Sequence, residues 1–256
     1  MQDMQEIILL CLVAFIAGFV DAIIGGGGLI QTPTALVVLP QYPVATVIGT
    51  LKVPAIAGTS LASLQYARKV KLEYALLGSM MLIAGVAAYG GSALLTVISN
   101  NFMKPFILVV LVLVAIYTFA NKSFGLHMEK AHTKKQEWLY CILISLVLGF
   151  YDGFIGPGAG SFLVLAFIGF LGFDFLRASA HAKLVNLSTN LGSICLFALK
   201  GKIIYSIALP MAICNAAGGF FGARLAILKG NKFIRIFFLA IVTITIVRFA
   251  YDVFSK

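Results

Sequence analysis

Long apolar runs separated by short polar segments dominate the hydropathy pattern of this chain. The runs cover residues 7–24, 44–67, 74–98, 106–120, 138–155, 184–199, 203–221 and 233–249. Most of them approach the roughly 20 residues that a helix needs to cross the hydrocarbon core of a bilayer. The pattern therefore predicts an all-α polytopic membrane protein, with 8 spans by hydropathy.

Composition agrees with this prediction and changes how the net charge is interpreted. Hydrophobic residues make up 61% of the chain and charged residues 11%, whereas an average soluble domain is about 25% charged. A formal charge of +10 would suggest a nucleic-acid partner in a soluble protein. Here Lys and Arg gather between the apolar runs, where they report membrane orientation instead. We expect a multi-pass protein of the cell (inner or plasma) membrane, with the lipid bilayer and no nucleic acid as a partner.

The N-terminal segment "MQDMQEIILL" carries Asp3 and Glu6 but no Lys or Arg. It lacks the basic region of a signal peptide, so we expect the first apolar run to be retained as a membrane segment.

The second half of the chain aligns with the first half without a gap when Glu137 is placed on Glu6. This internal alignment matches glycines, acids and lysines as well as apolar residues. The matched glycines, acids and lysines include Gly18 with Gly149, Asp21 with Asp152, and Lys52 with Lys183. We therefore predict two homologous repeats, residues 5–121 and 136–253, joined by a polar connector at 122–135 that we expect to be cytoplasmic.

The direction of the two repeats depends on how residues 7–39 are drawn. One broken span there gives four membrane segments per repeat and parallel halves. A hairpin gives five segments per repeat, so that the chain has ten in an inverted five-plus-five arrangement. Both arrangements satisfy the positive-inside rule. The N-terminus, which carries no basic residue, favours an outside location and hence inversion.

Each repeat opens with a cluster of glycines that follows an acid, "DAIIGGGG" and then "DGFIGPGAG". Each glycine weakens a helix by about 1 kcal/mol relative to alanine, and Pro157 cannot donate a backbone hydrogen bond. The clusters predict Gly-broken helices, which transporters use to bind ions or substrates. The half-helices that follow would present N-termini that suit an anion. Close packing of helices through small residues is the alternative. The candidate substrate-binding residues are Gly25, Gly26, Gly27, Gly28, Gln31, Thr32, Gly156, Gly158, Gly160 and Ser161.

Lys52 and Lys183 lie inside apolar spans, where a lysine costs at least about 2.5–3.5 kcal/mol and a functional role is the first hypothesis. Each lysine either supplies positive charge to an anion or neutralises Asp21 or Asp152, the acid of the glycine motif in its own repeat. A polar stripe after Lys183 adds the candidates Asn186 and Asn190. These two amides either bind substrate or hydrogen-bond a neighbouring helix.

Three titratable residues are candidates for ion or proton coupling: Asp21, Asp152 and His181. The two acids are either coupling groups or structural ion partners. A lone histidine is more often a hydrogen-bonded structural residue. Without a nucleotide-binding domain in this chain, an ion gradient, most simply of protons, is the expected energy source.

No catalytic motif is present among those searched for, which were a Gly-x-Ser-x-Gly elbow, a His-Glu-x-x-His pair and a phosphate-binding Walker loop. The four cysteines lie within apolar runs and have no metal-ligand spacing. We therefore expect no enzyme activity, no metal and no cofactor.

The motifs "GFVDAIIGGGG" and "GFYDGFIGPGAG", the lysine-bearing spans after them, and "AICNAAGGFFGARLAI" resemble the sulfite exporter TauE/SafE family over essentially the whole chain. The resemblance implies secondary transport of small anions, with sulfite and sulfonates as the associated substrates. It leaves the substrate, the direction of transport and the oligomeric state open. Together with the broken helices it predicts alternating access of two repeats. An anion channel that uses the same glycine breaks and lysines is the alternative.

Overall fold

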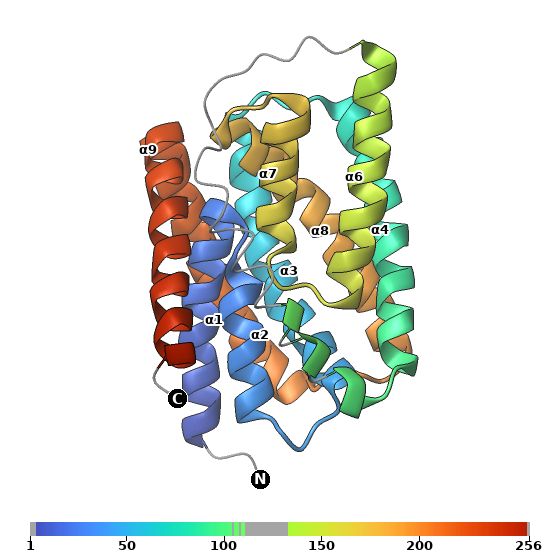
Figure 1. Ribbon diagram of the computed structural model, residues 1–256, viewed down its shortest axis with the longest axis vertical. Coiled ribbons are helices and arrows are strands. Elements are labelled where there is room, and N and C mark those ends of the chain that lie inside the picture. The colour runs from blue at the N-terminus through green and yellow to red at the C-terminus, as the bar shows by residue number, and fades with distance from the viewer. Residues whose placement is uncertain (1–3, 104, 108, 111–132, 255–256) are drawn as a thin grey trace.

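The computed structural model describes residues 4–103, 105–107, 109–110 and 133–254, which form a bundle of helices (Figure 1). No strand occurs within these ranges. Among the described residues, six helices are long and apolar enough to cross a membrane: α1 (Met4–Ile24), α3 (Val44–Lys69), α4 (Tyr74–Val97), α6 (Lys134–Phe154), α8 (Phe175–Leu199) and residues Tyr205–Ile234 of α9. The prediction of an all-α polytopic membrane protein is confirmed.

Two shorter apolar helices complete the described bundle. α2 (Gly27–Val38) has 12 residues and α7 (Ala159–Leu171) has 13. At 1.5 Å per residue they are about 18–20 Å long, short of the roughly 30 Å hydrocarbon core. α2 packs beside α1, and α7 beside α6, so each pair forms a helical hairpin.

Helices that correspond under the internal alignment run in opposite directions. In Figure 1, α1 starts at the lower end of the molecule, whereas α6 starts at the upper end. α3 likewise runs upward and α8 downward. α9 (Tyr205–Phe254) runs upward to Gly230, where a φ of 67° interrupts the helix, and then turns back.

Glycines bring several of these helices into close contact. A Cβ atom added to Gly218 of α9 would lie 2.0 Å from the carbonyl oxygen of Phe15 in α1. One added to Gly153 of α6 would lie 1.9 Å from the carbonyl oxygen of Ala88 in α4. Neither position can hold a larger side chain without separating the helices, as expected of membrane helices that pack through small residues.

Two boundaries differ from the hydropathy pattern. α8 begins at Phe175 rather than at residue 184, because Arg177, His181 and Lys183 lower the local hydropathy although all three are helical. Asp174 caps this start by accepting a hydrogen bond from the backbone N–H of Arg177. Of the proposed connector 122–135, residues 122–132 lie outside the described residues, and α6 begins inside its last two positions.

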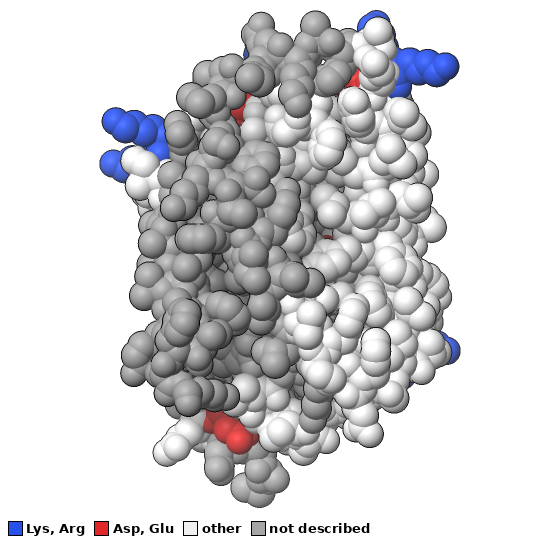
Figure 2. Space-filling model, viewed as in Figure 1, with Lys and Arg blue, Asp and Glu red and all other residues white. Residues whose placement is uncertain are grey.

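Few charged side chains lie on the middle of the outer face that Figure 2 shows. Figure 2 shows Lys and Arg gathered mostly at the upper end of this face, above a broad uncharged surface on the described part. Large apolar side chains such as Leu82, Val86 and Ile213 are more than two-thirds exposed on the molecule. A surface of this kind suits contact with lipid chains.

Candidate functional site

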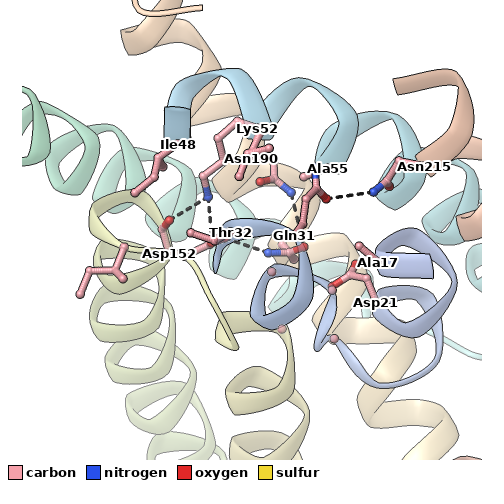
Figure 3. A pocket seen from close by; sticks show the side chains of 18 residues that line it. Ala17, Asp21, Gln31, Thr32, Ile48, Lys52, Ala55, Asp152, Asn190 and Asn215 are labelled. Atoms are coloured by element: carbon pink, nitrogen blue, oxygen red, sulfur yellow. Dashed lines mark hydrogen bonds and ion pairs between the residues drawn. The ribbon is translucent and has the colours of Figure 1, made fainter. Parts of the chain in front are cut away.

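A cavity of about 60 Å³ lies where the two helical hairpins meet α3, α8 and α9 (Figure 3). This volume has room for about four to six waters. Glycines of both hairpin turns line it: Gly25, Gly27, Gly28, Gly156 and Gly160. Its polar side chains are Asp21, Gln31, Thr32, Lys52, Asp152, Asn186, Asn190 and Asn215.

Lys52 of α3 and Asp152 of α6 form a buried ion pair at the cavity. The Lys52 Nζ lies 2.8 Å from Asp152 Oδ1 and donates a second hydrogen bond, of 2.7 Å, to the Asp152 carbonyl oxygen. Asp152 Oδ2 accepts hydrogen bonds from Asn186 Nδ2, at 2.8 Å, and from the Thr189 hydroxyl. Both carboxylate oxygens of Asp152 therefore accept hydrogen bonds from side chains of α3 and α8.

Asp21 of α1 and Lys183 of α8 form a second ion pair with a different environment. The Lys183 Nζ lies 2.6 Å from Asp21 Oδ2. The Lys183 side chain is fully buried, whereas the Asp21 side chain is 22% exposed. Asp21 lines the cavity and Lys183 does not. Of this pair, only the acid is accessible from the cavity.

The two ion pairs are crossed: each joins the two halves of the chain, whereas the sequence suggested one pair within each half. Pairing of each lysine with the acid of its own repeat is wrong, because Lys52 contacts Asp152 and Lys183 contacts Asp21. Each pair therefore joins one half of the chain to the other. The physical reason is that the ends of α1 and α6 meet at one cavity, which Asp21 and Asp152 both line, so that each acid comes within hydrogen-bond distance of the lysine of the other half.

The two hairpin turns contact each other directly. The backbone N–H of Ser161 donates to the Gly25 carbonyl oxygen at 3.1 Å, and the Ser161 hydroxyl donates to the Ile24 carbonyl oxygen at 3.0 Å. Gly25 has a φ of 81°, and a Cβ there would lie 2.2 Å from the carbonyl carbon of Gly160. Both the left-handed conformation and the contact require glycine at this position.

Gln31 and Asn215 add neutral hydrogen-bonding groups on one wall. The Asn215 Nδ2 donates to Gln31 Oε1 at 3.2 Å and to the Ala14 carbonyl oxygen at 2.9 Å. Gln31 is 4% exposed, and its Nε2 has no hydrogen-bond partner among the described residues. A buried donor without a partner costs about 1–3 kcal/mol, which an acceptor in the cavity would recover.

The structure brings most of the predicted site residues to this cavity. The candidates that do not line it are Gly26, Gly158, Ser161, Lys183 and His181. Gly26 and Gly158 are the N-cap residues of α2 and α7, and Ser161 and Lys183 make the contacts given above.

His181 lies closer to the start of α8. Its ring packs against Phe173 with a centroid distance of 4.9 Å, and its Nδ1 lies 2.8 Å from the Arg177 carbonyl oxygen. The Nε2 atom accepts from the backbone N–H of Glu73 at 3.4 Å. Both ring nitrogens therefore have protein partners, and the proton-carrying role of His181 stays a prediction.

Sequence reasoning did not include Asn215 and Thr189 among the site residues. Their counterparts under the internal alignment are Ala84 and Gly58, so the comparison of the two halves carried no signal for either. For Thr189 the polar stripe after Lys183 was a usable sign. For Asn215 the sign was an amide side chain inside an apolar run, within the motif "AICNAAGGFFGARLAI".

The cavity combines hydrogen-bond donors with the two carboxylates of Asp21 and Asp152. It offers a lysine ammonium, amide N–H₂ groups and the backbone N–H groups at the start of α2, which have no partner within the helix. Within the described residues, no group of three or more His, Cys, Asp or Glu side chains could hold a metal ion.

Comparison with known proteins agrees with the membrane fold and the motifs. The family model for the sulfite exporter TauE/SafE matches residues 10–249. A "Probable membrane transporter protein ORF9" of Sinorhizobium sp. is 32% identical over 237 residues, which is 92% of this chain and 89% of that protein. A "Probable membrane transporter protein" of Haemophilus influenzae is 35% identical over 228 residues, covering 89% of this chain and 88% of that protein.

A third relative, the "Probable membrane transporter protein YfcA" of Escherichia coli K12, is 32% identical over 246 residues, covering 94% of this chain and 88% of that protein. No solved structure matches the chain significantly. The family match over nearly the whole length, together with the two glycine motifs at the cavity, shows that this chain belongs to the sulfite exporter TauE/SafE family of membrane transporters.

Proposed function

We propose that this chain is a secondary transporter of small oxyanions, sulfite or a small organosulfonate, with its substrate site at the central cavity. The observation that carries the proposal is the group of donors around that cavity: the Lys52 ammonium, the unpartnered Gln31 Nε2 and the first N–H groups of α2. The TauE/SafE family match supports the same substrate class.

The two halves would act as inverted repeats of five membrane segments, each opening with a Gly-broken helix. Three observations support this arrangement: the opposite directions of α1 and α6, the crossed ion pairs, and the glycine turns that meet at Gly25 and Gly160. Part of the fifth segment of the first half falls within residues 111–132, outside the described residues. Rocking of one half against the other would expose the cavity to each side in turn.

An arriving anion must compete with a carboxylate for Lys52. In this structure Asp152 Oδ1 forms an ion pair with the Lys52 ammonium, at 2.8 Å from Nζ. Gln31 Nε2 and the α2 N-terminus have no such competitor, so they would bind the anion first. A shift of Lys52 toward the anion would then leave Asp152 with the Asn186 and Thr189 hydrogen bonds.

Charge balance links this step to proton uptake. An anion added to two neutral ion pairs leaves one net negative charge in a low-dielectric site, which is strongly unfavourable. A proton on Asp21 or Asp152 would remove that charge. Asp21 suits this role better, because its side chain lines the cavity, is 22% exposed and accepts a hydrogen bond from a single side chain, Lys183.

The charge distribution supports an orientation in the cell membrane. The described cations at the upper end of Figure 1 include Arg68, Lys69, Lys71, Lys134, Lys135, Lys229 and Lys232, whereas Lys200 and Lys202 lie at the lower end. By the positive-inside rule the upper end would be cytoplasmic, as would the connector that precedes α6. The lower end, where α1 begins, would face outside.

Uptake by proteoliposomes tests the proposal. Purified protein would be assayed with sulfite, sulfate, taurine, sulfoacetate and acetate, with and without an imposed pH gradient. We expect saturable sulfite or sulfonate uptake with counterflow, accelerated by the gradient. Gln31→Leu, which keeps a side chain of similar size but removes the donor, should weaken apparent affinity, whereas Lys200→Gln at the lower end should not.

Three results would contradict the proposal. Flux that rises linearly with concentration and shows no counterflow would identify an anion channel instead. If the Gln31→Leu variant takes up the anion with the rate and affinity of the wild type, the substrate does not bind at the central cavity. The absence of anion flux with every substrate would refute the assigned substrate class.

A further inference from the structure

A second cavity lies away from the central site, in a groove between the end of α3 and the middle of α9. Its volume is about 300 Å³, five times that of the central cavity. Three basic side chains line it, Arg68 and Lys69 from the last turn of α3 and Arg224 from α9, beside the apolar side chains of Phe220, Ile227 and Leu228. We call this set of residues the basic groove.

Among the described residues, no anion lies within ion-pair distance of the three cations of the basic groove. The ion pairs of the described residues are Lys52–Asp152, Arg177–Glu73 and Lys183–Asp21, so none of them involves a groove cation. Arg68 and Lys69 gain something from the C-terminus of α3, which favours positive charge. Arg224 lies in the interior of α9 and has no such stabilisation from a helix end.

The apolar part of the basic groove continues onto the lipid-facing surface. Leu228 is 72% exposed and Phe220 is 38% exposed, and both belong to the outward face of α9. A hydrogen bond of 3.0 Å from Gln65 Nε2 to the Phe220 carbonyl oxygen joins α3 to α9 beside the groove. The groove thus has a fixed wall, a cationic rim and an open apolar side.

This combination fits one kind of ligand. A soluble phosphate would use the cations but gain nothing from exposed leucine and phenylalanine. An anionic phospholipid uses both parts, because its phosphate meets the cations while its acyl chains lie along the apolar side chains. Basic pockets between membrane helices bind anionic lipid headgroups in this way.

The other half of the chain provides an internal comparison. At the equivalent positions of the internal alignment, Leu199 replaces Arg68 and Ala93 replaces Arg224, whereas Tyr89 and Val97 stand for Phe220 and Leu228. The apolar wall is therefore shared by the two halves, and two of the three cations are not. The basic character is specific to the end of the bundle that carries most of the described Lys and Arg.

We propose that the basic groove binds an anionic phospholipid, with the headgroup phosphate between Arg68 and Arg224 and an acyl chain along Phe220 and Leu228. The site is separate from the central cavity and does not depend on which anion is transported. Bound lipid would bridge α3 and α9 and so stabilise their contact.

The test compares lipid binding to wild-type protein and to two matched double variants. Arg68→Gln/Arg224→Gln removes two groove cations, and Lys200→Gln/Lys202→Gln removes two cations at the opposite end. Native mass spectrometry and thermal stability would be measured in detergent with phosphatidylglycerol, with phosphatidylcholine, and with glycerol phosphate alone. Phosphatidylcholine also reports whether each variant is folded and equally stable without the anionic lipid.

We expect phosphatidylglycerol to bind wild type and the Lys200/Lys202 variant and to raise their melting temperatures. Loss of two cations should weaken this binding by roughly 30-fold in the groove variant. Glycerol phosphate should give no shift, because it lacks the acyl chain.

Three outcomes would overturn the inference. One is equal binding of phosphatidylglycerol to wild type and the groove variant, and another is equal stabilisation of wild type by phosphatidylcholine. The third is a full shift with glycerol phosphate alone, which would identify a site for soluble phosphate. If the groove variant does not fold, the single variants Arg68→Lys and Arg224→Lys would replace it. These must keep phosphatidylglycerol binding, since each retains the charge.

Discussion

The crossed pairing of Asp21 with Lys183 can be tested by comparing how much stability is lost when either partner is replaced. The two atoms of the pair, Lys183 Nζ and Asp21 Oδ2, are 2.6 Å apart, and the lysine side chain is fully buried while the aspartate side chain is 22% exposed. Asp21→Asn leaves a buried ammonium without a counter-charge, which should cost about 3–5 kcal/mol of unfolding free energy. Lys183→Met leaves a carboxylate whose side chain is 22% exposed and therefore partly solvated, so its cost should be smaller, about 1–3 kcal/mol.

The double variant Asp21→Asn/Lys183→Met separates the pair from its surroundings. Both charges are gone, so neither penalty remains, and we expect the double variant to be more stable than Asp21→Asn alone. The coupling energy between the two positions should therefore be at least about 3 kcal/mol. Unfolding free energies would be measured by titrating SDS into mixed micelles and following helical circular dichroism.

A second cycle supplies the control. Asp21→Asn with Lys52→Met removes an acid and a lysine from the same half of the chain, where the sequence alone suggested a pair. Because Lys52 contacts Asp152, this combination leaves two unpartnered charges, and the two losses should add. Coupling of Asp21 to Lys52 rather than to Lys183 would refute the crossed arrangement.

Four further substitutions test single positions. Gly25→Ala introduces a side chain at a φ of 81° and 2.2 Å from a backbone carbon, so SDS titration should show a loss of more than about 2 kcal/mol. Gly78→Ala, a helical site with open space around it, should be neutral or slightly stabilising in the same assay. Thr189→Val keeps the shape but removes a hydroxyl donor to Asp152, and it should cost about 1–3 kcal/mol of unfolding free energy. Gln31→Glu puts a carboxylate where the buried donor lies, so anion uptake by proteoliposomes should fall at least tenfold while circular dichroism stays unchanged.

Much of the fold could be predicted from the sequence, because the bilayer restricts what apolar runs can do. With no water to satisfy the backbone, such runs must be helical, and the described helices agree. The start of α8 was missed because hydropathy averages over a window, and Arg177 and Lys183 lower that average. Asp174, which caps the helix, was the more local sign.

The site was predictable in its residue types but not in its contacts. Acids, lysines and glycines that recur in both halves pointed to a common centre, and the structure places Lys52 and Asp152 there. Which acid meets which lysine depends on how separate helices pack, and a one-dimensional spacing carries no such information. Asn215 reaches the cavity wall because Gly58 leaves room for it: a Cβ at Gly58 would lie 2.0 Å from Asn215 Oδ1. A notch between two distant segments of this kind cannot be deduced from either segment alone.

The crossed ion pairs also set an order for assembly during synthesis. Lys183 follows Asp21 by 162 residues, and Asp152 follows Lys52 by 100. At about 5–20 residues per second, the chain needs roughly 8–32 s after Asp21 is made to complete its pair. Asp21 has no final partner during that interval, and Lys52 has none until Asp152 is made. Its membrane segments must therefore insert with these charges at water-accessible positions and settle into the bundle only when the second half arrives.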